Sequence, residues 1–269
     1  MTAALNRIAA LARRDLVIEL SYQFQLVLRL FSILMAIATF FFLGRLVGDS
    51  DELAGYAGGY FEFVLIGLVV MGFSQACVNA FGRSIQAAQG DGTFEILLST
   101  STRLTTLMLG TLVVPMLFAA AEAAIYLAFG WGLTGFVPPL GGVAIAGVLL
   151  LLTLGTFAAV GIFSAAVIVL TKRGDPFSSM VLQASNLLAG AMFPIALFPD
   201  WLQVVSRFVP AFYGLRGTRE VLLAGGGIGD VSADLIALVV LNAVLLPASL
   251  FALTRAIRMA RITGTLGNR

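Results

Sequence analysis

The chain has 269 residues, of which 59% are hydrophobic and only 11% are charged, and its formal net charge is +2. Soluble domains carry about 25% charged residues, so this composition predicts an integral membrane protein. The sequence has no histidine, which removes the usual general base and the commonest metal ligand, and we expect neither a catalytic nor a metal site. Lys172 is the only lysine and no glycine-rich loop precedes it, which excludes a P-loop ATP site in this chain.

The first expected element, residues 3–22, is an amphipathic helix lying in the membrane interface. Asp15 and Glu19 stand where the apolar core of a cleaved signal peptide would be, so we expect no such signal. The apolar residues that follow the helical period are Leu5, Ile8, Ala9, Ala12 and Leu16. The arginines on the opposite side are Arg7, Arg13 and Arg14.

Six apolar stretches follow, each long enough for the ~20 residues that a membrane-spanning helix needs. They are 24–47, 60–81, 104–129, 140–170, 177–198 and 234–253. The expected fold class is therefore an all-α membrane protein with six transmembrane helices in a single domain, 1–269. Arg29 is expected to snorkel to the interface, and Pro194 to distort the outer end of the fifth span.

Between the second and third spans, residues 92–102 are expected to form a short helix. Thr93 can cap it, while Phe94, Leu97 and Leu98 share one face three and four residues apart. Two interpretations stay open: the face docks into a cleft of a partner, or it rests on lipid head groups. Glu95 can equally pair with a partner or remain solvated.

Residues 199–229 are too long for a turn and too interrupted for a span. Prolines and glycines break the segment, yet it is rich in aromatic side chains, which predicts a re-entrant or interfacial helical hairpin, with an ordinary surface loop as the alternative. We expect Pro210 to end the first helix and Tyr213 to Leu223 to form the second. The expected packed face consists of Trp201, Leu202, Val205 and Phe208. Three arginines in the segment are expected to contact anionic head groups, with an acidic substrate as the alternative: Arg207, Arg216 and Arg219.

Polar side chains inside the spans are the candidates for a transport path. Glu122 in the third span is costly in hydrocarbon, so it either lines the path, pairs with another group or reaches the outer interface. Gln75 and Asn79 lie four apart on the second span and can bond across helices or line the path. Glu62 lies near the outer end of the same span.

Basic residues set the expected orientation. Six spans place both termini on one side, which collects eleven basic residues against four on the other, with Arg29 left within a span. The positive-inside rule makes the richer side cytoplasmic. Residues 92–102 then face the cytoplasm, and residues 199–229 face outward.

The whole pattern resembles the ABC-2 family of type-2 ABC exporter permeases. Two motifs carry the resemblance: Gly92-Thr93-Phe94-Glu95-Ile96-Leu97-Leu98-Ser99-Thr100 with Arg103, and Pro199-Asp200-Trp201-Leu202-Gln203 with Pro210, Tyr213 and Arg219. The first resembles the cytoplasmic coupling helix of the family and the second its extracellular hairpin between spans five and six. Ser101 stands where the family often has proline, so the resemblance does not define the residue at which the coupling helix ends.

The resemblance implies a permease subunit of an ATP-driven exporter, without an ATPase site of its own. Two ABC ATPase subunits would hold ATP and Mg²⁺ and dock on Gly92, Thr93, Phe94, Glu95, Leu97, Leu98 and Arg103. A second permease chain, identical or related, would complete the path in a bacterial inner membrane, beside membrane lipids and with no nucleic-acid partner. The outer gate would comprise Pro199, Trp201, Leu202, Phe208, Pro210 and Tyr213. We expect a drug-like or lipidic amphiphile as cargo, with a polysaccharide or lipid-linked glycan as the alternative. An ion-coupled secondary transporter using Glu62 or Glu122 is the rival class.

Overall fold

The computed structural model describes residues 2–48, 59–90, 104–135, 137–171 and 176–262. Every regular element in these ranges is a helix. The elements are α1 (Thr2–Ser21), α2 (Gln23–Val47), α3 (Gly59–Gly90), α5 (Leu104–Thr134), α6 (Leu140–Thr171), α7 (Pro176–Leu188), η2 (Ile195–Leu197), α8 (Asp200–Ser206), α9 (Pro210–Leu222) and α10 (Ser232–Ile262).

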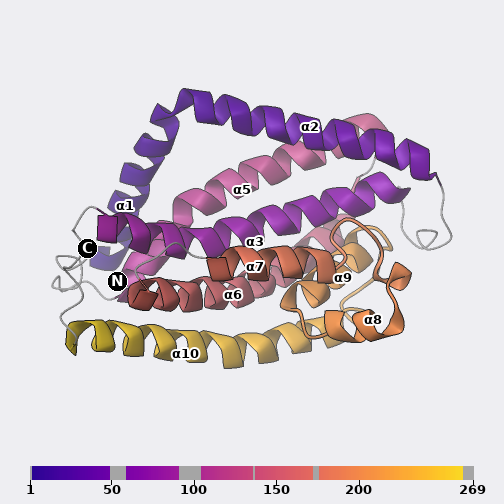
Figure 1. The fold of residues 1–269 in the computed structure, drawn as a ribbon. Helices are drawn as coiled ribbons and strands as arrows, with labels where there is room; N and C mark the ends of the chain where they lie inside the picture. Colours follow the sequence, from indigo (N-terminus) through magenta and orange to yellow (C-terminus); the bar gives the residue numbers. More distant parts are fainter. Residues whose placement is uncertain (1, 49–58, 91–103, 136, 172–175, 263–269) are drawn as a thin grey trace.

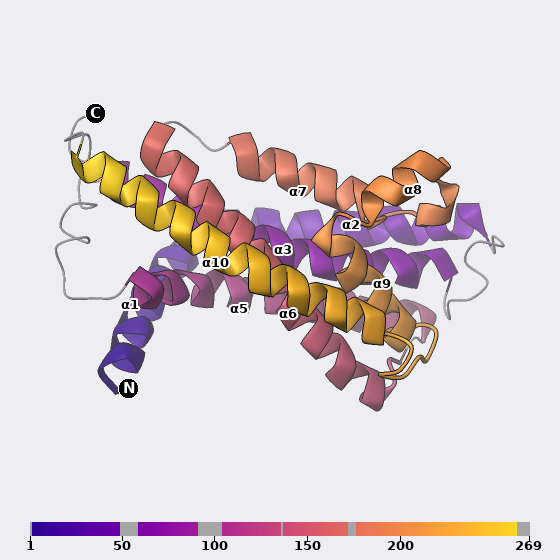
Figure 2. The ribbon, with the colours of Figure 1, turned by 90° about the horizontal axis from the view of Figure 1, so that it is seen from below.

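The long helices run lengthwise through the molecule, and α1 crosses them steeply at one end (Figures 1 and 2). The start of α1 and the end of α10 lie at the same end of the bundle, whereas α8 and α9 lie at the opposite end (Figure 1). This arrangement agrees with the expectation that both termini share one side. The side of the membrane to which that end corresponds remains a prediction from the basic residues.

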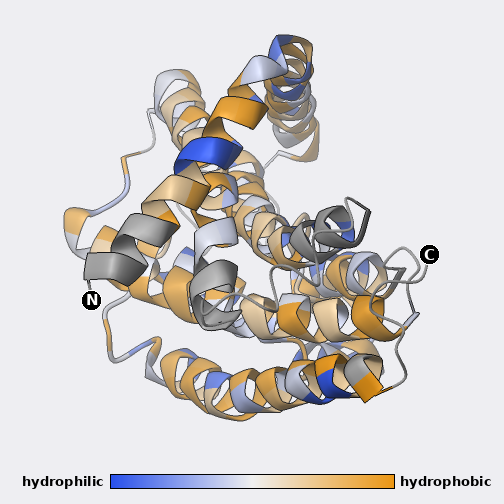
Figure 3. Ribbon diagram, turned by 90° about the vertical axis from the view of Figure 1, so that its left-hand side faces the viewer, coloured by the Kyte–Doolittle hydropathy of each residue, from blue (hydrophilic) through white to orange (hydrophobic). Residues whose placement is uncertain are grey.

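Among the described residues, five helices are long and apolar enough to cross a membrane: Gln23–Val47, Gly59–Arg83, Gly110–Thr134, Leu140–Thr171 and Ser232–Ala260. Hydrophobic residues dominate these helices when the bundle is seen from the end where α1 begins (Figure 3). Among them α3 has the largest buried share, whereas α2 and α10 present most of their apolar side chains outward, as helices that contact lipid do.

The centre of the bundle is built by α3, α6 and α10, which pack where small residues allow close approach. A Cβ at Gly161 of α6 would lie 2.6 Å from the Phe81 ring of α3 and 3.0 Å from the Val78 carbonyl oxygen. The Asn242 side chain of α10 lies against Gly155 of α6, and its Nδ2 donates to the Leu152 carbonyl at 2.8 Å. Small residues and interhelical amide bonds are how helices associate in lipid, where burial of apolar surface gains little.

The expected fifth span over 177–198 is wrong in its extent, because α7 ends at Leu188. Thirteen helical residues cover only ~20 Å, less than the ~30 Å hydrocarbon core. The stop is a Schellman motif: Gly190 has a φ of 67°, the Gly190 N–H donates to the Leu187 carbonyl, and the Ala191 N–H donates to the Asn186 carbonyl. Non-helical chain and η2 then carry the segment toward α8, so Pro194 does not distort a helix here.

The segment 199–229 does contain two helices, but its breaks differ from those expected. Pro210 begins α9 rather than ending α8, because a proline at the first helical position loses no hydrogen bond. Gly214 and Gly217 lie inside α9 and do not interrupt it. A Cβ at Gly214 would lie 2.1 Å from Thr153 Oγ1 of α6, so this glycine permits close helix packing.

The expected N-terminal helix is present as α1, which is separate from α2 and packs on α5 through Leu11 beside Gly110. Arg13 and Arg14 are exposed, as an interfacial helix requires. The expected coupling helix over 92–102 lies outside the described residues.

Candidate functional site

The first candidate site is the corner where α3, α9 and the chain after α7 meet, and Arg219 of α9 holds it together. This side chain is only 4% exposed. Its guanidinium donates from Nε to the Phe63 carbonyl at 3.2 Å, from Nη1 to the Gly190 carbonyl at 2.8 Å and from Nη2 to the Ala191 carbonyl at 2.7 Å. Its Cζ lies 3.4 Å from the centroid of the Phe63 ring. The fork of Arg219 therefore satisfies carbonyls at the point where α7 stops.

Gly67 of α3 explains why the broken backbone can approach so closely. A Cβ at this position would lie 2.1 Å from the Ala191 carbonyl oxygen and 3.0 Å from Arg219 Nη2. Any side chain here would displace the acceptor that Arg219 uses. Non-helical backbone at membrane depth is tolerated only where protein covers it, and α3 supplies that cover.

We therefore expect Gly67→Ala to lower the free energy of unfolding by about 1–3 kcal/mol through overpacking. The melting temperature of the purified protein in detergent measures this change. Gly132→Ala in α5 is the matched control, because a Cβ there meets nothing within 4 Å and alanine favours the helix. Equal melting temperatures for Gly67→Ala and the wild type would contradict this account of the corner.

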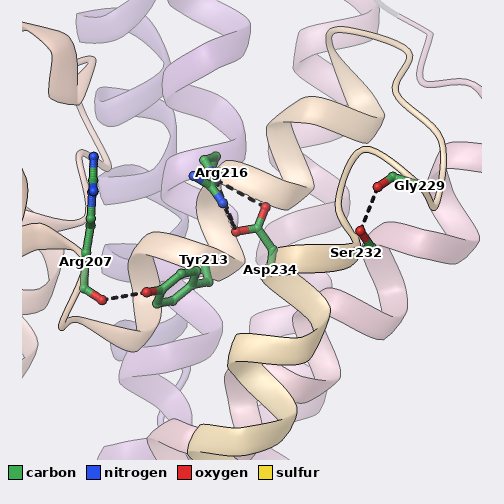
Figure 4. Close-up of polar contacts among 6 residues, drawn as sticks. All are labelled: Arg207, Tyr213, Arg216, Gly229, Ser232 and Asp234. Carbon is green, nitrogen blue, oxygen red and sulfur yellow. Dashed lines mark hydrogen bonds and ion pairs between the residues drawn. The ribbon is translucent and has the colours of Figure 1, made fainter.

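Two further contacts fix α9 beside this corner (Figure 4). Arg216 pairs with Asp234 at the start of α10, with Nη2 to Oδ1 at 2.6 Å and Nε to Oδ1 at 3.1 Å. The Tyr213 hydroxyl donates to the Arg207 carbonyl at 2.8 Å and links α9 to the end of α8. Arg219 is buried against protein carbonyls, which corrects the expectation that it contacts anionic head groups. Arg216 pairs with Asp234 while 47% of its side chain stays exposed, and its contact with head groups stays a prediction.

The expected packed face of α8 is exposed in this chain. Trp201 is 67% and Phe208 is 80% exposed, and Val205 is exposed as well. Leu202 and Pro210 are half-buried, as is Tyr213, whereas Pro199 is exposed. The buried face of the hairpin belongs to α9 instead, because glycines at 214 and 217 let α9 approach α6. The structure thus leaves α8 with an apolar surface that this chain does not cover.

The second candidate site is an ion pair between spans, formed by Arg29 of α2 and Glu122 of α5. Arg29 Nε donates to Glu122 Oε1, and Arg29 Cζ lies 5.0 Å from the centroid of the Phe118 ring. The side chains are 36% and 21% exposed. Arg29 therefore binds a neighbouring helix in addition to any contact with the interface. Of the three alternatives for Glu122, the structure shows pairing with another group, and the side chain stays partly exposed. The two residues are 93 positions apart, so sequence spacing could not reveal the pair.

The other polar candidates on α3 do not converge on one cluster. Gln75 is exposed and Asn79 is half-buried on the face that Gly72 also occupies. Glu62 is only 1% exposed, and neither of its carboxyl oxygens has a hydrogen-bond partner of good geometry among the described residues. The described residues also contain no group of three or more His, Cys, Asp or Glu side chains arranged to hold a metal ion.

The residues expected to dock an ATPase lie outside the described part of the chain: Gly92, Thr93, Phe94, Glu95, Leu97, Leu98 and Arg103. Their role stays a prediction. The helices on either side, α3 and α5, place both ends of this stretch at the end of the bundle where α10 ends (Figure 1).

Comparison with known protein families identifies a match that covers most of the chain. The family described as "ABC-2 type transporter" matches residues 7–223, from α1 through α9, which is more than half of the chain. No curated protein matches the sequence. The matched region contains four of the long apolar helices, both candidate sites and the stretch predicted to dock an ATPase. The chain therefore belongs to the ABC-2 type transporter family and is a multi-pass membrane permease of an ABC transporter.

Proposed function

We propose that this permease exports a drug-like or lipidic amphiphile, driven by a separate ABC ATPase subunit that binds residues 92–103. The observation that carries the cargo class is the uncovered apolar face of α8, at the end of the bundle away from the termini. Trp201 of this face and Phe208, two residues after the end of α8, would meet the tail of an amphiphile leaving the path. A carbohydrate would favour stacking platforms ringed by polar groups, and the exposed side chains of α8 are mainly apolar.

Assembly and stimulation test the proposal. The chain is co-expressed with a candidate ABC ATPase subunit from the same genome, purified through a tag on the permease and reconstituted in nanodiscs. We expect the ATPase to co-purify and its hydrolysis of ATP to rise when lysophosphatidylcholine is added. A lipid-linked oligosaccharide serves as the second probe. Stimulation by the oligosaccharide alone would replace the amphiphile with a glycan, and failure of the ATPase to co-purify would contradict the coupling.

The exposed face of α8 allows a sharp test of the gate. We expect Trp201→Ala and Phe208→Ala to leave the melting temperature unchanged, because both side chains are exposed, and to lower ATP-driven export several-fold. Ile228→Ala is the matched control, because Ile228 is an exposed apolar residue in the chain between α9 and α10, outside the face of α8. Full export by both aromatic variants would make α8 a passive interfacial helix.

A further inference from the structure

Glu122, the acidic partner of Arg29, lies at the middle of its membrane-spanning helix, whereas Arg29 lies in the first half of Gln23–Val47. Glu122 is the central residue of the candidate span Gly110–Thr134, and Gly72 is next to the centre of Gly59–Arg83. A Cβ at Gly72 would lie 3.6 Å from Glu122 Oε2, so the middle of α3 lies beside Glu122 at the same level of the bundle. Charged groups at the centre of a bilayer are costly, and they persist where they pair or serve transport.

The pair leaves hydrogen-bonding groups unused on both partners. Arg29 donates through Nε only, to Glu122 Oε1. Among the described residues, no group bonds to Nη1 or Nη2 of Arg29 or to Oε2 of Glu122. Both side chains also keep substantial exposure, at 36% and 21%. Four donor hydrogens on Arg29 and one carboxylate oxygen therefore remain for a ligand.

The pair between Arg216 and Asp234 shows what a purely structural ion pair looks like in this protein. There the guanidinium uses both Nε and Nη2, the carboxylate uses both oxygens, and the Asp234 side chain is 3% exposed while that of Arg216 is 47% exposed. Such bidentate geometry with a buried carboxylate exploits the fork of an arginine. Arg29 and Glu122 therefore share fewer hydrogen bonds than we expect of an ion pair that only joins two helices.

The surroundings of the pair suit an amphiphile. Phe118 lies against the guanidinium of Arg29, and the neighbouring side chains Leu28 and Leu30 on α2 are apolar and exposed. A ligand whose charged head reaches the pair would thus have its tail beside apolar groups. Gln75, exposed three residues after Gly72 on the same face of α3, adds a polar group on that side.

From these observations we propose that Arg29 and Glu122 form a subsite for a zwitterionic head group. Arg29 Nη1 and Nη2 would bind its phosphate or carboxylate, and Glu122 Oε2 would accept from or face its ammonium. A zwitterion satisfies both unused groups without leaving a net charge in the bilayer, which neither a cation nor an anion can do. The inference rests on the proposed function and names its substrate class: a zwitterionic amphiphile.

Binding to the permease alone tests the subsite, independently of ATP and of transport. The protein is reconstituted in nanodiscs of phosphatidylglycerol, so that no zwitterionic lipid competes. Three probes share one fluorescent acyl tail and carry a phosphocholine, a trimethylammonium or a phosphate head. Fluorescence anisotropy, corrected for empty nanodiscs, gives each affinity. We expect the phosphocholine probe to bind about tenfold or more tightly than the other two, because it makes both charged contacts.

Variants separate binding from helix packing. We expect Glu122→Gln to bring phosphocholine affinity down to that of the phosphate probe. The double variant Arg29→Glu with Glu122→Arg keeps an ion pair for folding but exchanges the charges, and we expect it to lose about tenfold in phosphocholine affinity. Arg45→Gln is the matched control, because Arg45 is on the same helix and faces Phe41 at 4.8 Å, far from the pair in sequence.

The outcomes are decisive. Wild-type phosphocholine affinity in the exchanged double variant would assign the pair to structure alone and overturn the subsite. Equal affinities of the three probes would overturn it as well. Glycerophosphocholine, which has the head group without a tail, is added as a competitor: weak competition supports an amphiphile, and full competition at equal concentration overturns that class. ATP-driven transport in the presence of any of these negative results would leave the exporter function standing.

Discussion

Arg219→Ala should destabilise the permease by about 3–5 kcal/mol, the largest loss of stability that we expect from a single substitution. The change removes the donors for the carbonyls of Phe63, Gly190 and Ala191, and it leaves these acceptors buried where water cannot replace them. The melting temperature in detergent and the rate of proteolysis after α7 measure the effect.

Two variants isolate the cause. Arg219→Lys keeps the charge but cannot reach three carbonyls with a planar fork, so we expect it to recover only part of the loss. Arg207→Ala removes an exposed arginine from the same hairpin and should change the melting temperature little. A stable Arg219→Ala protein would show that the three carbonyls find other donors and that Arg219 does not hold the corner.

Leu97→Asp should abolish co-purification of the ATPase while leaving membrane insertion intact. If Phe94, Leu97 and Leu98 fill a cleft of the ATPase, the carboxylate would be buried there without a partner, at a cost of several kcal/mol. Pull-down of the ATPase through a tag on the permease measures the loss. Ser99→Asp is the matched control, because Ser99 would project opposite the shared face of the helix predicted over 92–102.

Retention of the ATPase by Leu97→Asp would refute the docking hypothesis. The segment would then be a helix on lipid head groups, the interpretation that its amphipathic pattern also allows. Loss of the ATPase in the Ser99→Asp control as well would point to any added charge in this stretch, and would not support a specific apolar face.

Hydropathy predicted the long helices well, because a bilayer requires long apolar runs and the sequence separates them clearly. It failed at α7, where the apolar run continues past the end of the helix. Gly190 sits inside that run, and its C-cap signal was the one local clue. The carbonyls freed by the stop are satisfied by Arg219, 28 to 29 residues later, and no local pattern contains that partner.

The segment 199–229 shows a second limit of prediction from the sequence. Its glycines indicate breaks in the helices, but Gly214 and Gly217 instead allow close packing of α9 on α6, next to Thr153 and Leu149. Composition does not distinguish a glycine that ends a helix from one that admits a neighbour. The apolar spacing of α8 was correct for a helix, yet it did not show that the face points away from this chain.

The candidate sites divide in the same way. The sequence indicates Glu122 as a candidate because a carboxylate inside a membrane span is energetically costly, and an ion pair is one of the alternatives that it predicts. Its partner, Arg29, was assigned to the interface, since its place near the start of a span gives no hint of α5. Sequence thus identified the costly charge, and only the packing of α2 against α5 identified what meets it.

ATP-driven transport in inverted membrane vesicles tests the exporter proposal most directly. Vesicles contain the permease and its partner ATPase, and the probe is lysophosphatidylcholine with a fluorescent tail. We expect the probe to accumulate in the vesicle lumen only with hydrolysable ATP, to persist when an uncoupler collapses the proton gradient, and to vanish with Leu97→Asp. Accumulation that needs a proton gradient and no ATP would contradict the proposal and make this permease an ion-coupled transporter.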